Sequence, residues 1–235
     1  MLSVIVPTYN EAENLSDFIS TLDGALRNIE HEVIIVDDNS PDGTGDIAES
    51  FKKKYTNVLA LRRLKKLGLA SAVMKGAEEA RGEIVATLNS DFQHPIKYLA
   101  TLYDYIDKYD IVIASRYINK AELRGWDKSR IFFSKFATFI THLILPGLRG
   151  IKDPLSGYFI FRKEIIKNTH IEVFGPKFLL SLLIECNAAR IIEIPYVFEG
   201  RRRGKSKASL YDGILFLGYL LKGTYTKGTY RSHRR

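Results

Sequence analysis

Residues 2–11 read LSVIVPTYNE, a short apolar run that leads directly into a polar segment. A run of five residues rich in Val and Ile is typical of a strand buried on both faces. Similar runs occupy residues 32–36, 58–61, 84–88 and 111–114. Helical patterns lie between them, at residues 12–28, 44–54, 69–80 and 95–107. This alternation predicts an α/β fold, a mainly parallel sheet flanked by helices with right-handed crossovers.

The second half of the chain is less regular. It predicts a long aromatic helix at residues 127–145, a strand at 158–161, a helix at 177–188 and a strand at 191–194. A basic loop at 201–209 precedes an apolar stretch at 210–221, which we interpret as an amphipathic helix. We therefore expect a catalytic domain over residues 1–200, followed by an appendage over residues 201–235 with a basic loop, an interfacial helix and a basic tail.

The positive charge of the chain is concentrated near its end. The chain has a net charge of +8, and residues 201–235 hold ten Lys and Arg against one acidic residue, Asp212. Residues 1–200 hold 25 basic and 26 acidic residues and are therefore nearly neutral. Such a basic segment indicates nucleic acid or an anionic membrane surface as a partner. An RNA-binding aromatic pattern and a recognition helix are both missing from the sequence, so it favours the membrane and no nucleic-acid partner is expected. The single cysteine excludes an internal disulfide framework.

Polar segments follow the predicted strands, where ligands of open α/β sheets bind. Residues 37–44 read DDNSPDGT, and a turn alone does not require two adjacent aspartates. Residues 89–95 read NSDFQHP, in which Asn89, Asp91 and Gln93 lie two apart and share one face of an extended segment. Oxygen ligands in this arrangement suit Mg²⁺ or Mn²⁺ bridging a diphosphate. We interpret His94 as a turn residue, whereas Arg116 adds a guanidinium at the same edge.

These segments together resemble a known family. VPTYNEAENL, VDDNSPDGT, the Gly68-Leu69-Ala70-Ser71-Ala72 stretch, NSDFQHP and KDPLSGYFIFRK occur in the order found in the dolichol-phosphate mannose synthases. Those are family 2 glycosyltransferases with the GT-A, Rossmann-like fold, and the resemblance runs from about residue 2 to residue 222. Residues 153–157, DPLSG, and the later RxxGxSK at 201–207 are similar to mannose synthases rather than to polyprenyl-phosphate glucose synthases.

The resemblance implies roles for particular residues. It implies catalytic roles for Asp91, Arg116, Arg130 and Asp153, and metal ligation by Asn89, Asp91 and Gln93. It also implies a nucleotide-sugar site made of Pro7, Tyr9, Glu11, Val36, Asp38, Asn89, Ser90, Asp91, Arg201, Arg203 and Lys207. The family has Asp where this chain has Asn89, so one anionic ligand is lost and affinity for the divalent cation should fall.

The implied activity is an inverting transfer of mannose from GDP-mannose to dolichyl or another polyprenyl phosphate. The alternatives are the same fold with another donor such as UDP-glucose, or a nucleotide-sugar-binding relative inactivated at Asn89. Phe residues at helical spacing in 132–139, together with the basic tail, indicate peripheral binding on the cytosolic face of a membrane. A separate membrane-anchoring subunit is a further expected partner, because members of the family recruit one or carry their own spans.

Overall fold

The structure is a computed structural model, and it describes residues 1–167, 177–185, 189–203, 216, 218 and 220. Its centre is a seven-stranded sheet in the order β3-β2-β1-β4-β7-β5-β8. The strands are β1 (Leu2–Thr8), β2 (His31–Asp37), β3 (Val58–Arg62), β4 (Ile84–Thr87), β5 (Ile111–Ser115), β7 (Phe159–Arg162) and β8 (Ile191–Pro195). Pairing is parallel except that β7 runs antiparallel between β4 and β5. The predicted mainly parallel sheet is therefore confirmed.

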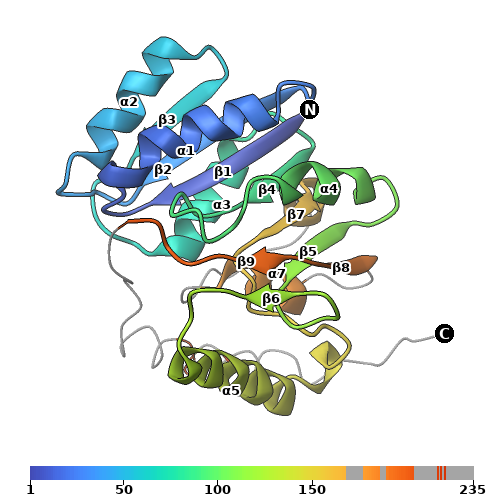
Figure 1. Cartoon of the computed structure of the whole chain (residues 1–235). Coiled ribbons are helices and arrows are strands. Elements are labelled where there is room, and N and C mark those ends of the chain that lie inside the picture. The colour runs from blue at the N-terminus through green and yellow to red at the C-terminus, as the bar shows by residue number, and fades with distance from the viewer. Residues whose placement is uncertain (168–176, 186–188, 204–215, 217, 219, 221–235) are drawn as a thin grey trace.

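Helices cover both faces of this sheet, as Figure 1 shows. Side chains of α1 (Ala12–Ala25), α2 (Thr44–Lys54) and α4 (Tyr98–Tyr105) pack in one apolar cluster with alternate residues of β1 and β2. Side chains of α3 (Leu69–Glu79) and α7 (Phe178–Glu185) pack in a second cluster on the other face. The approach of α3 to β1 is close, because a Cβ on Gly76 would lie 2.6 Å from Ile5.

The remaining elements are α5 (Lys128–Ile144), the 3₁₀ helix η1 (Pro146–Leu148), α6 (Glu164–Lys167) and a small parallel pair, β6 (Glu122–Leu123) with β9 (Val197–Phe198). Helix α5 lies apart from the main sheet in Figure 1 and contributes only partly buried residues to the second cluster. Neither β6 nor β9 was expected, because two-residue strands leave no periodic signal in a sequence.

The predicted interfacial helix at residues 210–221 lies mostly outside the described residues. Phe216, Gly218 and Leu220 are described and helical. Leu220 is fully buried and Phe216 packs against the second cluster, so these two side chains face the protein. These two side chains therefore do not form a lipid-facing surface.

Candidate functional site

Strands β1, β2, β4 and β5 end at the same edge of the sheet, because they share one direction. Tyr9 and Glu11 follow β1, Asp38 follows β2, the segment 89–93 follows β4 and Arg116 follows β5. Pro7 and Val36 lie within β1 and β2 and are buried. The fold thus brings these expected residues to one edge. Lys207 lies outside the described residues.

The carboxylates of residues 37–42 have separate roles. Asp37 accepts hydrogen bonds from the Ser40 amide at 3.0 Å and from the Thr8 hydroxyl at 3.2 Å, so it holds the turn after β2. Asp42 accepts from the Thr44 amide at 3.1 Å and the Ala12 amide at 3.0 Å, and thereby caps two helices. Asp42 thus joins the first turns of α1 and α2.

Asp38 organises the loop between β3 and α3. Its carboxylate accepts from the backbone amides of Leu67 at 2.9 Å and Gly68 at 2.7 Å, and it pairs with Arg63 at 3.1 Å. The Lys66 ammonium from the same loop lies 4.0 Å from the centre of the Tyr9 ring. Arg63 and Lys66 therefore join Tyr9 and Asp38 at this edge, although no motif in the sequence singles them out.

The segment 89–93 forms the middle of the site. Asp91 is 1% exposed, and its carboxylate accepts from the Gln93 amide at 3.1 Å. Phe92 adopts a positive φ of 60°, a conformation that costs free energy for an aromatic residue and is retained mostly at functional turns. Within the described residues, the buried Ser90 hydroxyl and the Gln93 side-chain nitrogen have no hydrogen-bond partner. Such orphaned groups indicate a polar ligand.

His94 supports this segment from beneath. Its Nδ1 accepts from the Asn89 amide at 3.1 Å, and its ring stacks on Tyr158. Burial lowers the pKa of His94 to about 3, with the charges of Arg116 and Lys177 acting in the same direction. The imidazole is therefore neutral at pH 7 and able to accept this bond. His94 is more than the turn residue that the sequence indicated.

Residues 199–203, which we call the strap, cross the site directly after β9. The Arg201 guanidinium pairs with Asp91 at 2.7 Å and with Glu11 at 3.1 Å. Arg203 instead lies along α1, where it donates to the Glu13 carbonyl at 2.7 Å. Of the two arginines expected at the nucleotide, Arg201 thus lies on the central carboxylate and Arg203 lies on the neighbouring helix.

Arg116 and Asp153 form a buried ion pair. The Arg116 Nε and Nη2 donate to the two Asp153 oxygens at 2.8 and 2.7 Å, and the Arg116 amide adds a third bond at 2.9 Å. Burial lowers the pKa of Arg116, but the Asp153 carboxylate outweighs burial and raises that pKa above its ordinary value. The pair ties the end of β5 to the loop before β7.

Arg130 is the other expected guanidinium, carried on the first turn of α5. It lies 4.6 Å from the centre of the Trp126 ring, and Arg116 lies 5.7 Å from the same ring. Burial, and then the positive charge of Arg201, lower the pKa of Arg130. The positive charges of Arg201 and Arg116 thus both act on Arg130, which favours a bound anion there. The sequence offered no signal for Trp126 beyond its being the single tryptophan.

The donor set at Asn89, Asp91 and Gln93 fits a divalent cation only weakly. It offers two neutral amides and one carboxylate, and that carboxylate is already paired with Arg201. In the described parts of the chain, no group of three or more His, Cys, Asp or Glu residues could hold a metal. A hard cation prefers several anionic oxygens. These residues therefore fit a cation that receives most of its ligands from a bound diphosphate.

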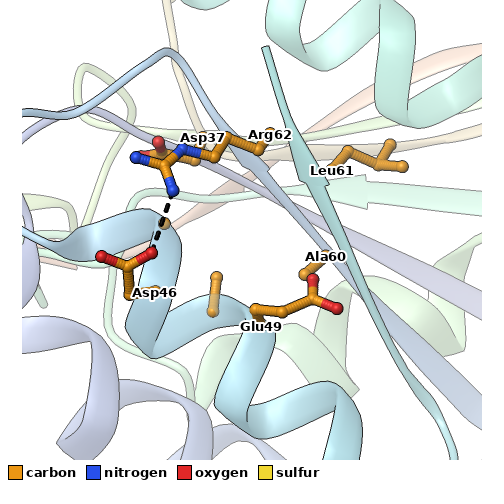
Figure 2. A pocket seen from close by; sticks show the side chains of 8 residues that line it. Asp37, Asp46, Glu49, Ala60, Leu61 and Arg62 are labelled. Carbon is orange, nitrogen blue, oxygen red and sulfur yellow. Dashed lines mark hydrogen bonds and ion pairs between the residues drawn. The ribbon is translucent and has the colours of Figure 1, made fainter.

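A cavity of about 250 Å³ lies between α2 and β3, and Figure 2 shows it with Asp37, Asp46, Glu49, Ala60, Leu61 and Arg62 labelled. Arg62 donates to Asp46 across it at 2.9 Å, and Glu49 pairs with Lys52. Asp37 points its carboxylate into the turn after β2. Each of these polar side chains thus already has a partner in the protein. The cavity is therefore a gap between two elements beside the site, rather than the site itself.

One face of α5 is apolar and exposed. Its large side chains on this face are all at least half exposed: Phe132, Phe133, Phe136, Phe139 and Leu143. Soluble proteins rarely expose a contiguous aromatic patch of this kind without a partner. Among the described helices, none is both long and apolar enough to cross a bilayer. The predicted aromatic stripe on this helix is thus an exposed surface and not part of the core.

Two curated proteins are similar to this chain over most of its length. The chain is 40% identical over 207 residues to a dolichol-phosphate mannosyltransferase of Pyrococcus furiosus, covering 88% of this chain and 58% of that relative. It is 32% identical over 216 residues to a polyprenol monophosphomannose synthase of Mycolicibacterium smegmatis, covering 88% and 80%. The chain thus spans little more than half the length of the archaeal relative.

Solved structures show the same fold at low identity. A mannosyl-3-phosphoglycerate synthase of Rubrobacter xylanophilus superposes with a TM-score of 0.70 at 15% identity, covering 100% of this chain and 78% of that one. A glucosyl-3-phosphoglycerate synthase of Mycobacterium tuberculosis, solved with Mn²⁺ and UDP-glucose, gives 0.67 at 16%, covering 96% and 79%. The model described as Glycosyl transferase family 2 matches residues 3–169. The chain therefore belongs to glycosyl transferase family 2, as its motifs predicted.

Proposed function

We propose that this protein transfers mannose from GDP-mannose to a polyprenyl phosphate, such as dolichyl phosphate, at a membrane surface. The observation that carries the proposal is the buried Asp91 at the carboxyl edge of the sheet, with Arg201 against it and Arg130 close by. A nucleoside diphosphate sugar and a phosphate acceptor are both anionic, and this neighbourhood provides guanidiniums for both. The names of the two relatives supply the acceptor class.

The chemistry requires charge neutralisation and positioning more than a strong base. A phosphate oxygen of the acceptor attacks C1 of the sugar from the face opposite the diphosphate, and the bond from C1 to the diphosphate oxygen breaks. GDP leaves with the bonding electron pair, so the configuration at C1 inverts. The acceptor phosphate is already anionic at neutral pH. The protein contributes by holding the two groups in line and by stabilising the charge on the departing diphosphate.

Arg130 is the residue we assign to the acceptor phosphate. Its guanidinium lies over Trp126, and its first-turn position is fixed by Asp127, which accepts from the Arg130 amide at 2.8 Å. Arg116 is held by Asp153 and acts by keeping the end of β5 in place. Asn89, Asp91 and Gln93 would hold a divalent cation bound together with the diphosphate, and the cation would supply charge stabilisation there.

The exposed Phe face of α5 brings this site to its lipid acceptor. Arg130 lies on the same helix as Phe133 and Phe136, so a helix that inserts these rings into the headgroup region would bring the guanidinium close to a lipid phosphate. The proposed location is peripheral, on the cytosolic face of a membrane. A membrane-anchoring subunit remains among the proposed partners.

Turnover with short-chain polyprenyl phosphate tests the proposal. We expect mannosyl phosphate product from GDP-mannose and none from UDP-glucose, with and without Mn²⁺. We also expect GDP to bind at least about tenfold more tightly than UDP in calorimetry, or ~1.4 kcal/mol. Product from UDP-glucose would reassign the donor. Tight GDP binding without any turnover would instead identify a nucleotide-sugar-binding relative inactivated at Asn89.

A further inference from the structure

The strap is fixed to the site at several points along its length. The Glu199 amide donates to the Gln93 carbonyl at 3.2 Å, and the Arg202 amide donates to the Asp91 carbonyl at 3.4 Å. The Arg202 guanidinium lies 3.8 Å from the centre of the Phe92 ring. On the other side, the Asn14 side chain donates to the Arg203 carbonyl at 3.3 Å. Arg201 therefore lies in a segment whose neighbours are bonded both to the segment 89–93 and to α1.

A close approach of backbones holds the start of the strap. A Cβ built on Gly125 would lie 2.6 Å from the Gly200 Cα, and Gly125 has a φ of 72°. Glycine at this position lets the segment after β6 pass directly against the strap. Arg201 follows at once, with its side chain 17% exposed and shared between Glu11 and Asp91. Its place is therefore set by the fold on both sides.

The charges around Arg201 differ from those of a site built for a metal. Asn89 is neutral, and the one carboxylate of the segment 89–93, that of Asp91, is paired with Arg201 at 2.7 Å. A guanidinium in this position offers a fixed positive charge with several N–H donors, which matches the oxygens of a diphosphate. Unlike a divalent cation, it does not have to be recruited from solution.

We propose that Arg201 is a resident counter-ion for the donor diphosphate and replaces most of the charge that a divalent cation would supply next to Asn89. On binding, the nucleotide diphosphate takes up the N–H donors that Arg201 directs at Glu11 and Asp91 in the free protein. Nucleoside diphosphate binding then depends little on divalent cation. This inference rests on the proposed function, because it takes the ligand to be a nucleoside diphosphate sugar.

Calorimetric titration of the full chain with GDP, in EDTA and in excess MnCl₂, tests the inference without relying on turnover. For the wild type we expect the two dissociation constants to agree within about threefold. Arg201→Gln should weaken GDP binding in EDTA by at least about tenfold, because it removes one member of a desolvated charge pair. Mn²⁺ should restore most of that affinity to the variant, since Arg201 no longer offsets the negative charges of Asp91 and Glu11. Arg201→Lys, which keeps the charge but not the planar fork, should be intermediate.

Two further variants make the result specific. Arg190→Gln removes the same charge from a surface pair with Asp110 at the opposite end of the sheet, and should change neither titration. The double variant that combines Asn89→Asp with Arg201→Gln should bind GDP strongly only in the presence of Mn²⁺. Thermal melting by circular dichroism checks that each variant is folded.

The outcomes separate the inference from the proposed function. Wild-type GDP affinity that falls more than about tenfold in EDTA overturns the inference and leaves the proposed function standing. Unchanged EDTA affinity in a folded Arg201→Gln variant also overturns the inference. Failure of GDP to bind under either condition overturns the proposed function itself.

Discussion

At the scale of single residues, the adjacent carboxylates of Asp37 and Asp38 have different structural roles because their hydrogen-bond partners differ. Asp38 has three donors from one loop, and a neutral side chain would satisfy them less well. We expect Asp38→Asn to lower the free energy of unfolding by about 1–3 kcal/mol, the usual range for disturbing a buried polar group, and to weaken GDP binding. Urea denaturation and calorimetry measure the two effects.

A matched control for Asp38 lies nearby on α2. Asp46 pairs with Arg62 at 2.9 Å, but its side chain is 76% exposed. Exposed pairs contribute little, so Asp46→Asn should leave both the stability and GDP binding nearly unchanged. Equal losses in the two variants would mean that Asp38 acts only through overall charge and not through the loop.

His94 makes the stability of the protein depend on pH. Burial lowers its pKa from the ordinary 6.5 to about 3 in the folded protein, so the unfolded chain takes up the proton first as the pH falls. The contribution is fully present above pH 6.5 and is lost as the pH falls below it, at about 1.4 kcal/mol per pH unit. Denaturation of wild type and His94→Gln between about pH 6.5 and 5 measures this slope. The free energy of unfolding of the variant should depend on pH less steeply by that amount. Parallel curves for the two proteins would contradict the lowered pKa of His94.

At the scale of elements, the strongly periodic half of the chain could be predicted from sequence and the irregular half only in part. The fold was predicted from buried apolar runs such as those at β1, β2 and β4. The position of the site was predicted from the polar residues that follow these runs. The antiparallel insertion of β7 depends on tertiary pairing with β4 and β5, which no local pattern encodes. The same holds for the pairing of Arg201 with Asp91, because its members lie far apart in sequence.

The exposed face of α5 makes a prediction at this scale. Phe133→Ser/Phe136→Ser should reduce binding to anionic vesicles by at least about tenfold, since each ring would otherwise bury apolar area in the headgroup region. The melting temperature should hardly change, because these side chains are 66% and 50% exposed. Tyr105→Ser on α4, which packs on the other sheet face, is the control and should bind vesicles as the wild type does. Undiminished binding of the double Phe variant would remove α5 from the proposed membrane contact.

At the scale of the whole molecule, apolar and charged contributions to membrane binding separate along the chain. The exposed rings belong to α5, whereas the excess positive charge belongs to residues 201–235. Burial of apolar area is insensitive to salt, but attraction between Lys or Arg and anionic lipid is screened within about 10 Å at 0.1 M salt. Two contributions should therefore add in binding to anionic vesicles. High salt should weaken the electrostatic contribution of the basic residues and leave the apolar contribution of α5 in place.

Removal of residues 222–235 tests the charged part. This segment holds five Lys and Arg and no acidic residue, and each basic group near an anionic surface contributes about 1 kcal/mol at most. The deletion leaves Leu220 in place, which matters because that side chain is buried in the second cluster. We expect weaker vesicle binding at low salt, nearly equal binding at high salt and unchanged GDP affinity, since the nucleotide edge is built from β1, β2, β4 and the strap. Co-sedimentation at two salt concentrations measures the first two quantities and calorimetry the third. A deletion that weakens binding equally at both salt concentrations would show that the tail acts through apolar contact, and a loss of GDP affinity would place the tail in the nucleotide site.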